Sequence, residues 1–248
     1  MGKRVIALAS GDKRFSIAGA FEKKENPSFG LDCGEVAGVG KIGIPITEKI
    51  VGFDVLIDFS SPEGILSALD LALENNASFV SGTTGLNEKI IGLLKESSKK
   101  IGVFHAPNFS AGIAAVEKAA VELSKMLGNA DIEINEKHHN LKADAPSGTA
   151  LKLAKAIADN KNIALEENAV YCRKGNIGAR KKDEIGILSL RGGGIVGDHE
   201  IIFANKFETI IVEHRAISRD LFAAGALDAA EFIFGKTGFF DMNDLINQ

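Results

Sequence analysis

The 248-residue chain is 45% hydrophobic and carries 29 basic against 33 acidic side chains, for a formal net charge of −4. A nucleic-acid binder needs a clustered excess of positive charge, and zinc sites or disulfide frameworks need patterned cysteines, whereas Cys33 and Cys172 stand far apart. No segment reaches the roughly 18 apolar residues of a membrane span, so we expect a cytoplasmic protein without nucleic-acid or membrane partners.

The first half alternates short apolar runs with longer segments of helical period, which indicates βα units around a parallel sheet. Strands are predicted over 15–21, 53–59, 78–81 and 101–105. Helices are predicted over 62–75 and 86–99, where apolar residues recur on one face. The small and polar residues after each strand should meet at the carboxyl edge of the sheet, where such folds bind ligands.

After residue 110 a long helix is predicted to about residue 127, followed by a β-rich section with one helix beginning near Ser147 or Gly148. The predicted strands cover 131–136, 170–173, 186–190, 199–204 and 208–214. Residues 220–234 are predicted to form another amphipathic helix, which we expect to pack against the first domain. The pattern therefore indicates an α/β unit combined with a mixed α+β unit.

Reactive side chains are densest in the run EKHHNLKADAPSGTA, residues 136–150. His138, His139 and Lys142 stand within five residues of one another. Histidine exchanges protons near neutral pH, and a partly desolvated lysine can act as an acid or hold an anion. In isolation such a run is more often a strand end with a solvated lysine. Adjacent strand histidines face opposite sides, so we expect no metal site.

The same run contains a helix start. Ser147 has the side chain of an N-cap, and the N–H groups of Gly148 and Thr149 would then point at a carboxylate. Because anions bind at helix N-termini, the run combines proton-transfer groups with an anion site.

The run closely resembles the E-x-H-H-x-x-K-x-D-A-P-S-G-T-A signature of the dihydrodipicolinate reductase family. Other family-like segments occur collinearly over nearly the whole chain: AGAFEKK, DFSSPEG, SGTTGL, APNFSAG, SLRGGGIVGDH and HRAISRDLFAAGAL. The resemblance implies a Rossmann-like dinucleotide-binding domain, residues 1–109 and 219–248. It also implies an α+β domain with a mixed sheet, residues 110–218, for substrate binding, catalysis and assembly into a homotetramer.

The resemblance further implies reduction of 4-hydroxy-tetrahydrodipicolinate, a small dicarboxylate, to tetrahydrodipicolinate in lysine and diaminopimelate biosynthesis, with NADH or NADPH as cofactor. On the matching positions His138 would be the acid/base and Lys142 the proton donor. His139 would contact substrate, and the amides of Gly148 and Thr149 would hold its carboxylate. A cation and backbone amides would bind a dianionic substrate, and a nearby acid would protonate a carbanion-like intermediate.

Arg191 and Arg219 are further cations in family-like segments. The sequence favours neither of two interpretations, that they are site residues or that they are surface charges. On the cofactor side, Glu22 follows the strand predicted over 15–21, where dinucleotide folds place an acid against the adenosine ribose. Lys23 would take a 2′-phosphate, so neither NADH nor NADPH is favoured. Without the resemblance these two residues would be an ordinary charged turn.

Two loops resemble the family's walls around the nicotinamide. One contains Gly82, Thr83 and Thr84; the other contains Ala106, Pro107, Asn108 and Phe109. By composition alone GTTG is only a turn, and its position after a predicted strand adds weight to the resemblance.

The start of the sequence departs from the family. Met1 and Gly2 align with the last two positions of a G-x-x-G-R-M-G loop, so the first strand and the glycines before them are missing from this sequence. We expect a true start upstream. The alternative is a non-catalytic oligomeric homologue that lost cofactor binding with that loop.

Overall fold

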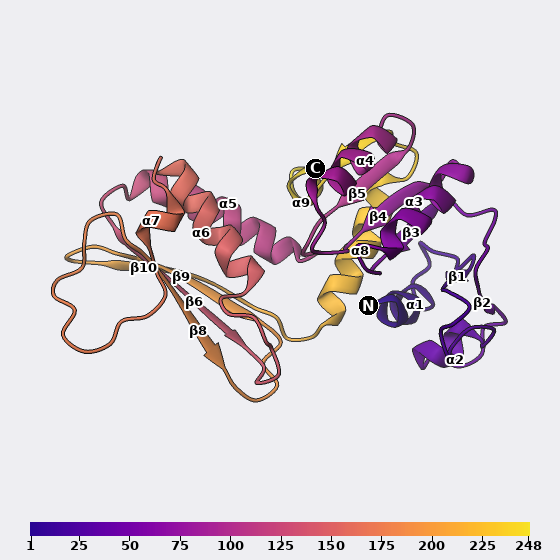
Figure 1. Cartoon of the computed structure of the whole chain (residues 1–248), viewed down its shortest axis with the longest axis horizontal. Helices are drawn as coiled ribbons and strands as arrows, with labels where there is room; N and C mark the ends of the chain where they lie inside the picture. Colours follow the sequence, from indigo (N-terminus) through magenta and orange to yellow (C-terminus); the bar gives the residue numbers. More distant parts are fainter. The chain divides into compact units, whose positions relative to one another are not determined.

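The computed structural model describes all of residues 1–248. Contacts divide the chain into two units, shown in sequence colours in Figure 1. Unit 1 comprises Met1–Ala111 and Asp220–Gln248, and unit 2 comprises Gly112–Arg219. None of the helices combines the length and apolarity that crossing a bilayer requires.

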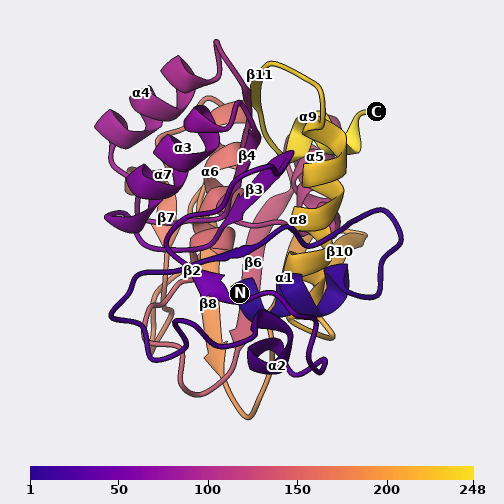
Figure 2. The same ribbon diagram turned by 90° about the vertical axis from the view of Figure 1, so that its right-hand side faces the viewer.

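Unit 1 is built on a four-stranded parallel sheet of order β11-β5-β4-β3. Its strands are β3 (Val55–Asp58), β4 (Ser78–Ser81), β5 (Gly102–His105) and β11 (Gly238–Phe240). Its longer helices are α3 (Gly64–Glu74), α4 (Glu88–Ser97) and α8 (Asp220–Ile233). Figure 2 shows α3 and α4 on one side of the strands and α8 on the other. Helices on both faces explain why Phe79, Val80, Val103 and Phe104 are fully buried.

The first fifty residues of unit 1 form a smaller layer. It contains α1 (Gly2–Ala9), α2 (Cys33–Ala37), β1 (Ala20–Phe21) and β2 (Ile46–Thr47). The parallel pair β1-β2 is a separate two-stranded sheet. The strand predicted over 15–21 is therefore wrong for its first five residues. Phe15 instead donates its N–H to the carbonyl of Asp12, 3.1 Å away, in a turn.

The carboxylate of Asp32 holds the loop between β1 and β2. It accepts the backbone N–H groups of Gly34, Glu35, Ile42, Gly43 and Ile44 at 2.7 to 3.2 Å. These bonds lower the pKa of Asp32 against the opposing effect of burial. A single side chain thus accepts hydrogen bonds from backbone N–H groups that are not paired within a strand.

Unit 2 is a mixed five-stranded sheet of order β10-β9-β6-β8-β7. Its strands are β6 (Asp131–His138), β7 (Ala169–Val170), β8 (Ile185–Arg191), β9 (Asp198–Ala204) and β10 (Thr209–Arg215). The central strand β6 runs parallel to β8 and antiparallel to β9. The strand predicted over 170–173 is shorter than expected, because Arg173 leaves the ladder and its guanidinium binds the carboxylate of Glu133 at 2.7 and 2.9 Å.

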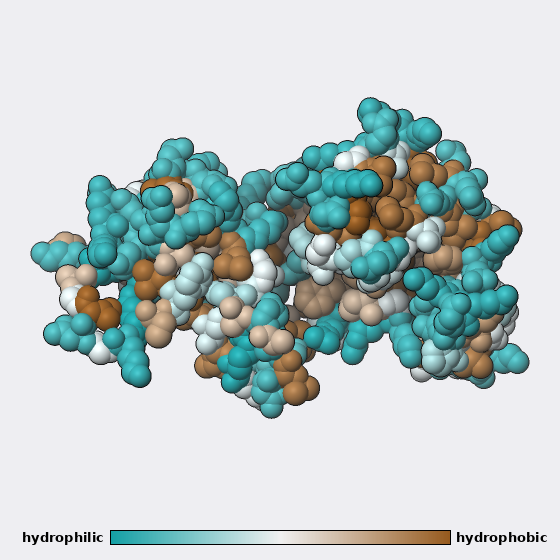
Figure 3. All heavy atoms as spheres, in the orientation of Figure 1, coloured by the Kyte–Doolittle hydropathy of each residue, from teal (hydrophilic) through white to brown (hydrophobic).

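One face of this sheet is covered by helices, as Figure 1 shows. The helices of unit 2 are α5 (Ala111–Met126), α6 (Gly148–Asn160) and α7 (Leu165–Asn168). Ile132, Ile134, Ile187, Ile201 and Phe203 project toward them into a single apolar core. Polar residues cover most of the visible face of both units in Figure 3. The remaining short helix, α9 (Met242–Ile246), closes unit 1.

Candidate active site

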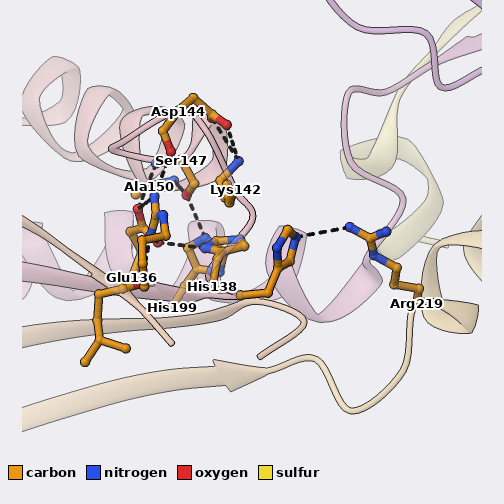
Figure 4. Close-up of polar contacts among 11 residues, drawn as sticks. Glu136, His138, Lys142, Asp144, Ser147, Ala150, His199 and Arg219 are labelled. Carbon is orange, nitrogen blue, oxygen red and sulfur yellow. Dashed lines mark hydrogen bonds and ion pairs between the residues drawn. The ribbon is translucent and has the colours of Figure 1, made fainter. Parts of the chain in front are cut away.

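Strand β6 ends beside the start of helix α6. Ser147 is the N-cap of α6, and its Oγ accepts the N–H of Ala150 at 3.2 Å. The N–H of Ser147 in turn donates to Oε1 of Glu136 in β6, at 3.1 Å. This bond brings the end of the strand, with His138, next to the first turn of the helix, with Gly148 and Thr149 (Figure 4).

Glu136 is fully buried. Its two oxygens accept Nη1 and Nη2 of Arg191 at 2.8 and 2.7 Å, and Oε2 also lies 2.6 Å from Nδ1 of His138. Burial raises the pKa of Glu136, but the hydrogen bonds from Arg191 and His138 outweigh it and lower that pKa to about 2. The carboxylate is therefore ionised at every physiological pH.

His199 on β9 is the second buried imidazole of the site. Its ring packs edge-on against that of His138, with centroids 5.3 Å apart. Its Nε2 lies 3.0 Å from Oγ of Ser147. Burial, and next the nearby His138, lower the pKa of His199 to about 4, so this ring is neutral at pH 7.

The loop between β6 and α6 carries Lys142. Its N–H donates to the carbonyl of His139 at 3.2 Å, and its Nζ binds both oxygens of Asp144 at 2.7 and 2.8 Å. Lys142 lowers the pKa of Asp144 through that hydrogen bond. His139 points away from His138, and its Nε2 lies 3.5 Å from Nη2 of Arg219. The loop therefore presents one ammonium group and a second, separate imidazole (Figure 4).

The predicted residues of unit 2 converge at this place, with two additions. Arg191 is bound bidentately to Glu136, so it belongs to the cluster around that carboxylate rather than standing alone at the surface. Glu136 and His199 were missed as functional residues. The alternation of β6 was a usable signal, because it places Glu136 on the same face as Ile132 and Ile134, and a carboxylate on a core face needs partners.

In unit 1 the side chain of Asp58 anchors the loop after β4. Asp58 accepts Oγ of Ser81 at 2.9 Å and Oγ1 of Thr83 at 2.7 Å, and Thr83 is buried. A Cβ on Gly82 would stand 2.1 Å from the ring of Phe59, so only glycine fits there. Thr84 is exposed. Thr83 thus holds the loop, while Gly82 and Thr84 offer backbone and hydroxyl groups at the carboxyl edge.

The loop after β5 has a buried end and an exposed end. Ala106 and Phe109 are buried, and the ring of Phe109 packs on Phe59 and Phe104, with centroids 5.5 and 5.7 Å away. Pro107 is exposed and Asn108 is partly exposed. Any cofactor contact of this loop would therefore be made by its middle residues and its backbone.

Glu22 follows β1 and is partly buried, whereas Lys23 is exposed. The N–H of Glu22 donates to the carbonyl of Thr47 at 3.0 Å, which extends the pairing of β1 with β2. Its Oε1 accepts the N–H of Lys23 at 2.9 Å. The carboxylate thus lies at a strand end, where dinucleotide-binding folds place the acid that binds the ribose.

Two family models together cover nearly the whole chain. Residues 1–109 match the model described as dihydrodipicolinate reductase, N-terminus, and residues 112–246 match dihydrodipicolinate reductase, C-terminus. The chain belongs to the dihydrodipicolinate reductase family. The resemblance carried by the sequence motifs is thereby confirmed.

Family members with close sequences bear the name 4-hydroxy-tetrahydrodipicolinate reductase. The one from Buchnera aphidicola subsp. Cinara cedri is 45% identical over 81% of this chain and 74% of its own length. The one from Syntrophus aciditrophicus is 40% identical over 99% of this chain and 94% of its own. The second alignment covers 99% of this chain and therefore extends through both units.

Solved structures share the fold at lower identity. A dipicolinate-bound dihydrodipicolinate reductase from Paenisporosarcina sp. TG-14 superposes with a TM-score of 0.76 at 22% identity, over 98% of this chain and 94% of that one. An amine dehydrogenase from Mycobacterium smegmatis reaches 0.57 at 10% identity, over 98% and 92%. The predicted combination of a Rossmann-like α/β domain and a mixed-sheet domain is confirmed.

Proposed function

We propose that this dihydrodipicolinate reductase family member is an NAD(P)H-dependent 4-hydroxy-tetrahydrodipicolinate reductase of lysine and diaminopimelate biosynthesis. The observation that carries the proposal is the junction at Glu136, which binds His138 at 2.6 Å and the start of α6, through Ser147, at 3.1 Å. One buried carboxylate thereby places a proton-transfer group beside a helix N-terminus suited to a carboxylate.

The residues of unit 2 divide the work on the substrate. The N–H groups of Gly148 and Thr149 and the ammonium group of Lys142 bind the dicarboxylate. His138 is the acid/base, Lys142 donates the proton, and His139 contacts the substrate. The net reaction replaces the C4 hydroxyl by hydrogen: it consumes NAD(P)H and one proton and releases water. A positioned acid is needed because the intermediate is carbanion-like.

The cofactor is a nicotinamide dinucleotide, which supplies the hydride when bound. Glu22 holds the adenosine ribose and Lys23 the 2′-phosphate of NADPH. The loops containing Gly82, Thr83 and Thr84, and Ala106, Pro107, Asn108 and Phe109, hold the nicotinamide end.

The protein works as a homotetramer in the cytoplasm. Support for assembly comes from the face of the unit 2 sheet opposite α5 and α6. Ile211 and Leu190 lie on that face, 55% and 50% exposed, whereas their neighbours Ile210 and Val212 pack into the core. An exposed apolar sheet face is suited to burial against other copies. Cys33 and Cys172 are both free thiols, in keeping with a reducing compartment.

The direct test is oxidation of NADH and NADPH, followed by absorbance, with 4-hydroxy-tetrahydrodipicolinate made enzymatically in the same cuvette. Turnover that depends on both substrate and nucleotide supports the proposal. Absence of both turnover and nucleotide binding would replace it by the alternative of a non-catalytic oligomer that lost cofactor binding, and nucleotide binding without turnover would refute both.

A further inference from the structure

The pair formed by the buried Glu136 and the partly buried Arg191 is not explained by folding alone. Glu136 is completely buried on the core face of the central strand. Desolvating a charge pair costs more than its mutual attraction commonly returns, and well-packed apolar residues of similar size often stabilise a fold as well or better. The retained charge therefore calls for a role beyond packing.

Strand register explains how the pair meets the acid/base residue. In the parallel ladder Glu136 stands opposite Ser189 and His138 stands opposite Arg191. Arg191 reaches diagonally across to both oxygens of Glu136, at 2.7 and 2.8 Å. Glu136 and His138 occupy alternate positions of one strand, so their side chains share a face. The guanidinium thus holds the carboxylate in the position from which it accepts Nδ1 of His138 at 2.6 Å.

The charges around this carboxylate come from every neighbouring element. Arg191 lies on β8, His199 on β9, and His214 on β10 faces His199. Lys142 and Asp144 stand in the loop before α6 and bind each other. Because His199 is neutral at pH 7, Arg191 is the permanent cation in contact with Glu136.

An ionised carboxylate only accepts hydrogen bonds, so the contact at 2.6 Å requires a proton on Nδ1 of His138. In the neutral ring the second nitrogen, Nε2, is then the free base. The space beside it is kept open by Gly197, since a Cβ there would stand 3.0 Å from Nε2. Proton exchange is thereby directed to one nitrogen.

The same carboxylate also sets the anion site. Oε1 accepts the N–H of Ser147, the N-cap of α6, at 3.1 Å. Arg191 adds a bond from Nη2 to the carbonyl of Asp144 at 2.7 Å. The second half of the loop before α6 is therefore hydrogen-bonded to the pair at Asp144 and at Ser147.

We propose that Glu136, held in place by Arg191, is the positioning residue of this active site: it fixes the Nδ1–H tautomer of His138 and aligns the first turn of α6. The inference deepens the proposed reductase function and rests on it. Neither residue touches the reacting atoms. Both act through His138 and Ser147.

The test is Glu136→Gln, whose amide has nearly the same shape but presents N–H donors. The tautomer is measured by nitrogen-15 NMR of the His138 ring at about pH 8.5, roughly two units above the ordinary imidazole pKa. We expect the Nδ1–H form in the parent protein and the Nε2–H form in the variant. Turnover should fall by about 10³ or more, near the 10⁴ known for the comparable Asp-to-Asn change in a serine protease.

A second variant guards against misfolding. Glu136→Gln leaves the partly buried Arg191 without its counter-charge, whereas the double variant with Arg191→Met removes the pair altogether. It should fold, lose the preference for Nδ1–H and remain slow. The matched control is Glu200→Gln on β9, whose carboxylate binds Asn135 at 2.7 Å away from the site. The control should keep the parent tautomer and turnover.

An unchanged His138 tautomer in Glu136→Gln or in the double variant overturns the proposal, and so does parent-like turnover in either variant. The NMR measurement needs no turnover. Lack of activity in the parent protein would thus refute the reductase function while leaving the tautomer result to judge the positioning role.

Discussion

Ser147 Oγ and His199 Nε2 lie 3.0 Å apart, although 52 residues separate them in the chain. The serine oxygen already accepts the N–H of Ala150, at 3.2 Å, as the N-cap of α6. Its hydroxyl proton is then directed to His199, which accepts it only when Nε2 is unprotonated. A neutral imidazole on β9 therefore supports the cap of the helix that forms the anion site.

Replacing His199 by Gln should change how stability depends on pH. The pKa of His199 is about 4 in the folded protein against the ordinary 6.5 of a histidine in the unfolded chain, so the unfolded chain binds the extra proton between these values. The parent should therefore lose up to about 3 kcal/mol relative to His199→Gln as pH falls from 6.5 to 4. Urea unfolding at a series of pH values measures the difference.

Titrating groups that do not interact with His199 cancel in that comparison. Glu136, with its pKa lowered to about 2 from 4.5, loses its contribution as pH falls from 4.5 to 2 and so overlaps only the acid end of this window. A stability difference that stays constant between pH 6.5 and 4 would contradict the assignment of His199 as a neutral buried ring.

Removing either proton-transfer group should abolish most of the turnover. His138→Gln and Lys142→Ala are each expected to lower kcat by about 10² or more, the usual worth of a general acid or base. Steady-state kinetics with saturating nucleotide measure the loss. Lys125→Ala, which removes an exposed lysine paired with Glu122 on α5, serves as control. Parent-like rates in both site variants would refute the assigned roles.

Lys23→Ala should alter the choice of nucleotide. Loss of a cation beside a 2′-phosphate should weaken NADPH binding by about tenfold, which corresponds to about 1.4 kcal/mol, and leave NADH binding unchanged. Calorimetric titration with both nucleotides measures the two affinities. Lys24→Ala is the matched control, because Lys24 is the exposed next residue. Equal weakening of NADH and NADPH would remove Lys23 from the phosphate site.

Two helical glycines should respond oppositely to alanine. A Cβ on Gly225 in α8 would stand 1.9 Å from the carbonyl oxygen of Phe109, so Gly225→Ala must displace the helix from the loop after β5. We expect a loss of about 1 to 3 kcal/mol, as for overpacked cores. Gly92→Ala in α4 meets no atom within 4 Å and should gain about 0.5 to 1 kcal/mol. Thermal and urea unfolding of the two variants should therefore shift in opposite directions.

Ile211→Glu should break the assembly. The side chain lies on the uncovered face of the unit 2 sheet, and a carboxylate there cannot be buried without a partner. Sedimentation velocity should show a tetramer for the parent and smaller species for the variant. Met126→Glu, an equally drastic change at an exposed position on α5, should leave the tetramer intact. A parent-like sedimentation coefficient for Ile211→Glu would locate any interface elsewhere.

Local patterns predicted most elements well. β4 and β5 begin and end within one residue of the predicted strands, and α8 ends one residue before its predicted end. The errors occur where a strand depends on pairing with a segment that is far away in the sequence. Residues 15–19 have strand-like composition but no neighbouring strand, and β11, which was not predicted, exists because Gly238–Phe240 pairs with β5. Strand formation depends on a partner that the local sequence does not contain.

By itself the sequence determined the two-part α/β plan, the family and the run from His138 to Thr149, because periodicity, caps and motif spacing are local properties. Only the tertiary structure decided that Glu136, Arg191 and His199 surround His138. They come from three neighbouring strands and meet through register and through the need of a buried carboxylate for partners. Strand alternation could indicate that Glu136 needs partners, but it could not identify them, since Glu136 and Arg191 are 55 residues apart.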